Sequence, residues 1–213
     1  KEVLDSVFSA AGRDLESIGL GFIKVDQVLE LSYLKDNGHS SSEFVNSCIR
    51  LLGLAGKYPG GRSHDRSAKP QSVKDYVSRV AERNGLDKQV LENQLDIVLN
   101  QNILNTDGLL NTDSHGSPLS LEFAAGTRFR CKKCSTLHLH KSANCCIRAK
   151  CSGDLEIETN DFDDDYYSWL STQEPRRLRA EELTGQTKPL EEQRKRQRFF
   201  RQALRPAPEE NPL

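Results

Sequence analysis

Five of the six cysteines in this chain fall between residues 131 and 151, and they constrain the fold more than any other feature. The first pair is Cys131-Lys132-Lys133-Cys134, and the second group is Cys145-Cys146 followed by Cys151. Two such knuckles joined by a short hairpin supply the four tetrahedral ligands that zinc requires. Secretory features do not accompany these cysteines, which favours metal binding over disulfides and predicts a reducing, cytoplasmic compartment. Their spacing favours a metal over free thiols.

The predicted zinc ligands are Cys131, Cys134, Cys146 and Cys151. Four residues separate the last two, and Ser-Gly follows them, as in the second knuckle of a zinc ribbon; whether Cys145 or Cys146 binds stays open. His138 and His140 alternate in Leu-His-Leu-His, and one of them can replace a thiolate. Residues 123–153 contain no acid to act as a general base, so the zinc is predicted to be structural. Zinc of that kind contributes roughly 10–16 kcal/mol to folding.

The charges of the chain are grouped, although its net charge is only −1. Residues 123–153 contain seven Lys and Arg and no acid, whereas residues 154–165 contain seven Asp and Glu and no base. A basic block can contact phosphates, and Arg128 and Arg130 are candidates for such contacts. The same positive charge can instead offset the negative charge of a zinc ion held by four thiolates. Both interpretations stay open at this point.

Helices are predicted before the cysteines. Ser40 to Glu43 form a capping box at the start of a helix that ends near Gly56. Two more helices follow a polar stretch, and short apolar runs after them predict a strand hairpin, which is the order of a winged-helix unit. The second of these helices, at about 87–101, carries Lys88 as its only basic residue. A packing role is therefore favoured over reading of a DNA groove.

These patterns predict an α+β chain. Its expected parts are a helical segment (1–56), a linker (57–72), a winged-helix-like unit (73–126), a zinc-binding module (127–160) and a final part (161–213). The final part contains the strand-like Arg177-Leu178-Arg179-Ala180-Glu181, then the loop Leu183-Thr184-Gly185-Gln186-Thr187, then a basic helix.

This order, with the zinc module before it, resembles the region just before the second motor-domain motifs of large bacterial superfamily 2 DEAD/DEAH-type helicases. Members of that group often carry a DUF1998/MZB-type zinc region, and several belong to anti-phage defence systems such as Druantia and DISARM. The resemblance covers about residues 119–204. It implies that residues 161–213 begin a RecA-like α/β motor domain.

The resemblance further implies an internal region of an ATP-dependent helicase or translocase that acts on nucleic acid, in particular DNA. Residues 184–187 fall on the family's loop near nucleic acid, and the helix after it carries Arg194, Gln197, Arg198 and Phe199. The residues implied in backbone contacts are Thr184, Gly185, Gln186, Thr187, Arg194 and Arg198. The remaining helicase domains are the implied partners, and ATP and Mg²⁺ are expected on them, because this sequence contains no G-x-x-x-x-G-K-[ST] loop. A start at Lys1 without any Met is expected for an internal stretch of a longer polypeptide, and a processed N-terminus is the alternative.

A non-enzymatic zinc-ribbon and winged-helix adaptor, which binds nucleic acid or a protein, is the alternative. A zinc hydrolase or deaminase needs an H-x-E or H-E-x-x-H arrangement, which the sequence lacks. No apolar run reaches the length of a bilayer span, so no membrane partner is expected.

Overall fold

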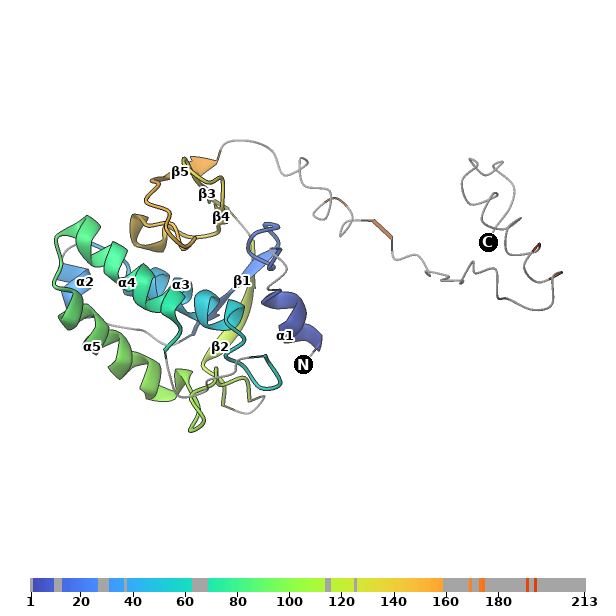
Figure 1. Ribbon diagram of the computed structural model, residues 1–213, viewed down its shortest axis with the longest axis horizontal. Coiled ribbons are helices and arrows are strands. Elements are labelled where there is room, and N and C mark those ends of the chain that lie inside the picture. The colour runs from blue at the N-terminus through green and yellow to red at the C-terminus, as the bar shows by residue number, and fades with distance from the viewer. Residues whose placement is uncertain are drawn as a thin grey trace. The chain divides into compact units, whose positions relative to one another are not determined.

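The computed structural model describes residues 2–9, 13–26, 31–36, 38–62, 69–113, 116–124 and 126–158, together with residues 169, 173, 174, 191 and 194. The chain divides into two compact units, Lys1–Thr172 and Gln173–Leu213. The first unit combines helices with two small sheets, which confirms the α+β class (Figure 1). Within the described part of the chain, no helix has both the length and the apolar character needed to cross a bilayer.

The central helix of the first unit is α3 (Ser41–Leu54), and it begins at the predicted cap. The hydroxyl of Ser40 accepts a hydrogen bond from the Glu43 amide at 3.3 Å, which satisfies one of the free N–H groups of the first turn. Every residue from Phe44 to Gly53 is buried. A helix buried around its whole circumference must have neighbours on all sides, so α3 is the centre of the packing.

Two longer helices follow, α4 (Gln71–Asn84) and α5 (Lys88–Val98). The first ends at Gly85, which has a left-handed backbone (φ 63°) that glycine adopts without steric cost. The second begins at Asp87, whose carboxylate accepts a hydrogen bond from the Val90 amide at 2.9 Å. A π-helical turn (Leu99–Ile103) extends α5. Two short helices lie earlier in the chain, α1 (Glu2–Val7) and α2 (Ser32–Asp36).

The strands before and after these helices form one antiparallel pair, in which β1 (Gly21–Val25) lies beside β2 (Leu119–Phe123). A winged-helix order predicts that β2 pairs with the strand just before it. Instead, the segment before β2 closes on itself through a single bridge between Leu104 and Leu110. The reason is that β1, which packs on α3, provides β2 with an apolar partner. Segments 1–56 and 73–126 therefore share one sheet and one hydrophobic core.

The beginning of the predicted linker is part of the folded unit. Lys57 and Tyr58 are only 3% and 6% exposed. The Tyr58 hydroxyl donates a hydrogen bond to Asp5 at 2.8 Å, and its ring stacks on Phe8 with 5.7 Å between the ring centroids. Residues 63–68 of the predicted linker lie outside the described residues.

Residues 128–158 form a second small sheet in the order β4–β3–β5, and we call this segment the cysteine module. Its strands are β3 (Arg128–Cys131), β4 (Leu137–His138) and β5 (Leu155–Glu158), and both pairings are antiparallel. A 3-10 turn, η2 (Ser142–Asn144), packs against α3. Ala143, Cys145 and Ile147 of the module belong to the same hydrophobic core as the helices. The module therefore packs against the helical part and is not linked to it by the chain alone.

Candidate metal centre

The sulfur atoms of Cys131, Cys134, Cys146 and Cys151 all lie within 4.8 Å of one another. The Sγ atoms of Cys131 and Cys151 are 3.6 Å apart, and those of Cys134 and Cys146 are 3.5 Å apart. Four sulfurs around zinc, with Zn–S bonds of about 2.3 Å, lie about 3.8 Å from one another at the corners of a tetrahedron. The cluster can therefore hold a metal ion, and its four soft ligands fit Zn²⁺.

The backbone of both knuckles points the sulfurs inward. In the first knuckle, the Ser135 amide donates to the Cys131 carbonyl at 2.9 Å, and Ser135 has a left-handed backbone (φ 57°). In the second, the Cys151 amide donates to the Arg148 carbonyl at 3.1 Å. The Arg148 amide donates to the Cys146 sulfur at 3.5 Å, a contact that stabilises a thiolate.

Gly153 gives the first knuckle the space that it needs. A Cβ atom at this position would lie 2.5 Å from the Cys131 sulfur and 2.7 Å from the Lys133 Cβ. Because the sulfur cannot shift without leaving the cluster, only glycine fits beside it. The Ser-Gly dipeptide after Cys151 is thus part of the site.

The thiols differ in their tendency to ionise. Burial raises the pKa of the Cys146 and Cys151 thiols above the ordinary value of 9.0. Burial also opposes ionisation of Cys134, but hydrogen bonds from Thr136 and from the neighbouring thiols outweigh it and lower its pKa to about 6. A metal ion binds all four as thiolates, so binding is expected to release protons.

The choice between the adjacent cysteines is resolved by the direction of their side chains. Cys146 lies in the sulfur cluster, whereas Cys145 is buried in the main hydrophobic core. Cys145 has an extended backbone (φ −128°, ψ 127°), in which successive side chains point to opposite sides. Cys48 also lies in that core, as its place on an apolar helix face indicates.

Neither histidine of the Leu-His-Leu-His segment belongs to the cluster. His138 is fully buried, and neither of its ring nitrogens has a hydrogen-bond partner. His140 accepts a hydrogen bond from the Ser142 amide at 3.2 Å through Nδ1, and its ring lies 5.3 Å from that of Phe22 between centroids. Burial is the main cause that lowers the pKa of both imidazoles, so both are held neutral.

A buried ion cluster connects the cysteine module to α3. Arg50 pairs with Glu16 at 2.9 Å and with Asp14, and all three are at most 5% exposed. Arg50 also donates to the Leu137 carbonyl at 3.1 Å, and the Leu139 amide donates to Glu16 at 3.1 Å. Sequence patterns gave no role to these residues. The signal that could have pointed to this cluster is Arg50 itself, a charged residue in the middle of an apolar helix.

A second polar contact anchors η2. The hydroxyls of Ser47 and Ser142 are 2.6 Å apart, and the Tyr76 hydroxyl donates to the Ser142 carbonyl at 3.0 Å. Ser142, Ala143 and Asn144 all have left-handed backbones, with φ between 47° and 55°. Such conformations cost energy for residues other than glycine and persist only where contacts hold them. These contacts come from α3 and α4.

The residues predicted to contact nucleic acid have different surroundings. Arg128 is buried and donates to the Gly19 carbonyl at 3.0 Å, and Arg130 pairs with Glu158 at 2.6 Å. Phosphate binding by these two stays a prediction, and their side chains are already engaged. Arg194 is helical and exposed. Residues 184–187 and Arg198 lie outside the described residues.

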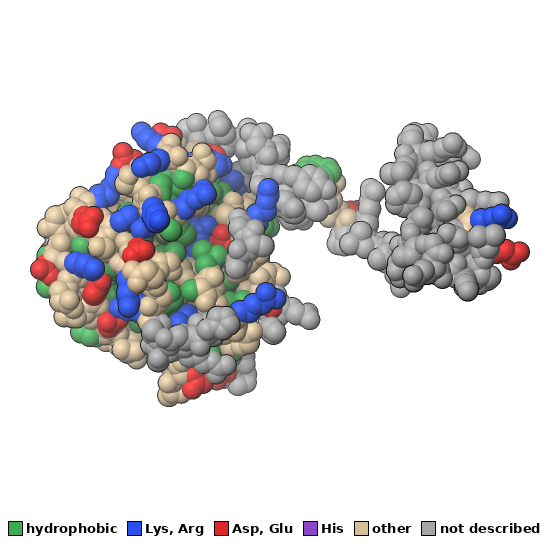
Figure 2. Space-filling model, viewed as in Figure 1, with side chains coloured by type: hydrophobic (Ala, Val, Ile, Leu, Met, Phe, Trp, Pro, Cys, Tyr) green, Lys and Arg blue, Asp and Glu red, His purple; other side chains and the backbone are tan. Residues whose placement is uncertain are grey.

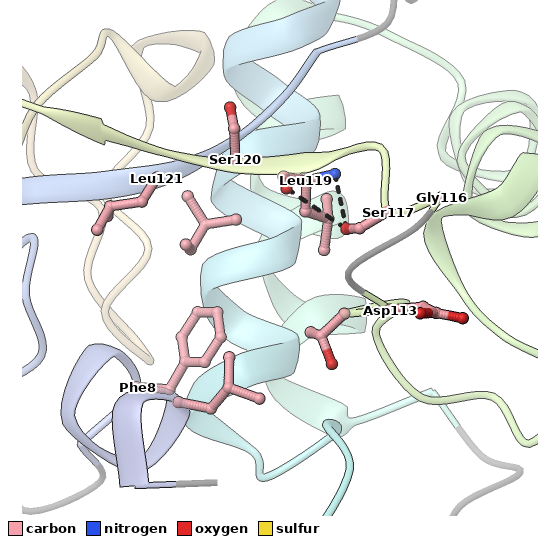
Figure 3. Close-up of a pocket in the computed structure, with 10 residues that line it drawn as sticks. Phe8, Asp113, Gly116, Ser117, Leu119, Ser120 and Leu121 are labelled. Atoms are coloured by element: carbon pink, nitrogen blue, oxygen red, sulfur yellow. Dashed lines mark hydrogen bonds between the residues drawn. The ribbon is translucent and has the colours of Figure 1, made fainter.

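An open pocket of about 320 Å³ lies between α1, the β1–β2 pair and the loop before β2 (Figure 3). Figure 3 shows Leu119 and Leu121 on the same side of β2 and Ser120 on the opposite side. Phe8 lines the pocket from the end of α1, and Asp113 lines it from the loop. The lining is mixed, without a cluster of ionisable groups that points to catalysis.

A scan against protein-family models, a search of curated proteins and a search of solved structures each give no match to this chain. A functional proposal therefore depends on the geometry of the cysteine cluster, on the charges around it and on the sequence patterns after it.

Proposed function

We propose that this chain is a zinc-stabilised, nucleic-acid-binding region of an ATP-dependent helicase or translocase that acts on DNA. The observation that carries the metal part is the closed cluster of four cysteine sulfurs, three of them buried. Zinc in catalysis keeps a position for water or substrate, whereas four protein thiolates fill every tetrahedral position. The metal would hold the two knuckles together and would not react.

The nucleic-acid part is supported by the sequence after the cysteine module. The resemblance to superfamily 2 helicases is most specific over residues 176–200, where the sequence predicts a basic helix after residues 184–187. Arg194 of that helix is exposed, as a phosphate contact requires. Contacts of this kind recognise the backbone, so binding should be largely independent of sequence and sensitive to salt. ATP and Mg²⁺ would bind to other parts of the motor, and the biological setting would be anti-phage defence.

The first test is binding by the zinc-loaded chain, measured as fluorescence anisotropy of a labelled single-stranded DNA, its duplex and the RNA of the same sequence. We expect binding at low salt that weakens steadily as salt rises. Replacing Arg194 and Arg198 together by Ala should weaken it. The matched control removes two cations elsewhere, Lys24 and Lys88, which pair with acids on β2 and α5.

The helicase proposal has a second test, on a longer natural polypeptide that contains this chain. Its ATP hydrolysis should be stimulated by DNA, and Cys131→Ala/Cys134→Ala should reduce that stimulation by disrupting the module. A chain that binds no nucleic acid at low salt would contradict the proposal.

An adaptor that binds a protein is the second candidate, and the exposed apolar side chains favour it. Leu121 is 41% exposed and Phe123 is 72% exposed on β2, next to the open pocket. The adaptor predicts no dependence of any ATPase on this chain and no binding to the three nucleic acids named above.

A further inference from the structure

The structure divides the seven basic residues of the cysteine module into two groups. Three are buried or paired with an acid: Arg128 is buried and donates to the Gly19 carbonyl, and the other two form ion pairs, Arg130 with Glu158 and Lys132 with Glu156 at 3.3 Å. The remaining four are exposed, and none forms an ion pair with another described residue. These four are Lys133, Lys141, Arg148 and Lys150.

Three of the exposed cations gather around the second knuckle. Arg148 and Lys150 stand in the loop between Cys146 and Cys151. Lys133, from the first knuckle, reaches the same place, because its Nζ donates to the Ser152 hydroxyl at 3.2 Å. We call Lys133, Arg148 and Lys150 the knuckle cations.

The acids closest in sequence to the knuckle cations are occupied. Asp154 forms an ion pair with Arg83 of α4, and Glu156 pairs with Lys132. The knuckle cations therefore have no carboxylate to neutralise them within the described residues. Their positive charges face water, where self-repulsion is unfavourable unless an anion binds.

The loop that carries these cations is held in place. Arg79 of α4 donates to the carbonyls of Cys146 and Ile147 at 3.2 and 3.3 Å, and the cysteine cluster fixes both ends of the loop. Figure 2 shows several Lys and Arg side chains, with Asp and Glu side chains among them, over the cysteine module and the adjoining part of α4. A rigid, positively charged surface of this kind suits a partner with regularly spaced negative charges.

The alternative is that the knuckle cations only offset the charge of the thiolates. That role is met from inside, by the Arg148 amide on the Cys146 sulfur and by the Arg79 guanidinium against the loop carbonyls. Exposed side chains add little to it, because water and salt screen them.

We propose that Lys133, Arg148 and Lys150 form a contact surface for the phosphate backbone of a nucleic acid, separate from the predicted contacts at residues 184–198. The inference rests on the proposed function, because it assumes that the chain binds nucleic acid. It replaces Arg128 and Arg130 as the phosphate contacts of this segment.

The test is a salt titration of DNA binding by the full, zinc-loaded chain, with fluorescence anisotropy of a labelled duplex. Arg148→Ala/Lys150→Ala should reduce the slope of log K against log salt by about 1.8, at about 0.9 per phosphate contact, and should weaken binding at least about tenfold at 0.1 M salt. Arg130→Ala should leave the slope unchanged. Lys24→Ala/Lys88→Ala removes the same net charge elsewhere and should have little effect.

Each outcome separates this inference from the proposed function. Wild-type binding with an unchanged slope in Arg148→Ala/Lys150→Ala would overturn the knuckle surface and leave the proposed function standing. An equal loss of affinity and slope in Lys24→Ala/Lys88→Ala would show that net charge causes the effect. That result would also overturn the knuckle surface. Absence of wild-type binding at low salt would overturn both. Zinc content and thermal unfolding of each variant establish that the module is folded.

Discussion

Arg50 binds both carboxylate oxygens of Asp14, through Nε at 2.6 Å and Nη2 at 3.0 Å, in the interior of the protein. The same guanidinium reaches Glu16 and the Leu137 carbonyl. One side chain of α3 therefore connects the segment after α1 to the cysteine module. A planar guanidinium suits this position because it donates in several directions at once.

Arg50→Met should reduce the free energy of unfolding by about 3–5 kcal/mol, because it leaves two buried carboxylates without a cation. Urea denaturation measures this directly. Lys88→Met is the matched control, since Lys88 pairs with Glu92 at the surface at 3.7 Å and its loss should cost less than about 0.5 kcal/mol. Equal losses of unfolding free energy in the two variants would argue that the buried ion cluster does not stabilise the packing of the cysteine module on α3.

Cys145→Ala and Cys146→Ala should differ in metal content. The purified wild-type chain should contain one zinc per molecule, and Cys145→Ala should keep it, because Cys145 faces the hydrophobic core. Cys146→Ala removes one of the four ligands and should lose most of the zinc. Elemental analysis and colorimetric zinc release read this out. Zinc loss from Cys145→Ala with retention in Cys146→Ala would reverse the assignment.

Gly153→Ala should weaken metal binding even though it changes no ligand. The added methyl group would lie 2.5 Å from the Cys131 sulfur, so that sulfur must move out of the tetrahedron. We expect a loss in zinc affinity of about 10- to 100-fold, in the range of changes next to metal ligands. Competition with a chelating dye measures it. Gly116→Ala is the control, because a Cβ there meets no atom within 4 Å.

Stability should fall as the pH drops below about 6.5. The pKa of His138 lies well below its ordinary 6.5, because burial and the nearby Arg50 and His140 disfavour the charged ring. The unfolded chain thus takes up a proton near pH 6.5 that the folded chain takes up only at lower pH. The free energy of unfolding then decreases by up to about 1.4 kcal/mol per pH unit for this group.

His138→Leu should reduce that pH dependence between pH 7 and 5, leaving the part that comes from the buried His140, and should cost no hydrogen bond, since neither ring nitrogen has a partner. His39→Leu, at a half-buried position, is the control for replacing a histidine by leucine. Urea midpoints at each pH, with zinc content measured in parallel, separate proton uptake from metal loss. A pH dependence in His138→Leu identical to wild type would refute the assignment.

The metal ligands were predictable from the sequence because their chemistry is local. The spacing of Cys131, Cys134 and Cys151 indicates two knuckles. Ser40 indicates the start of α3, because its hydroxyl accepts a hydrogen bond from an amide in the first turn of the helix. The spacing favoured Cys146 over Cys145 as the ligand. The structure supports this preference, because the extended backbone at Cys145 directs its side chain away from the sulfur cluster.

The partners of buried charges and strands were not predictable in the same way. Nothing local to Arg50 indicates that its carboxylates stand at positions 14 and 16. Likewise, the alternation of Leu119 to Phe123 gives a strand but not its partner, since any apolar strand with the same two-residue period fits the same face. Packing on α3 decides which strands pair, and this packing cannot be read from the sequence.

The pairing of β1 with β2 also affects how the protein is made. During synthesis, β1 leaves the ribosome while the helices that separate it from β2 are still being added. Until residues 119–123 emerge, the backbone donors and acceptors of β1 have no neighbouring strand and can join another nascent chain. The sheet is thus completed late, and any translational pause before residue 119 should favour aggregation over folding.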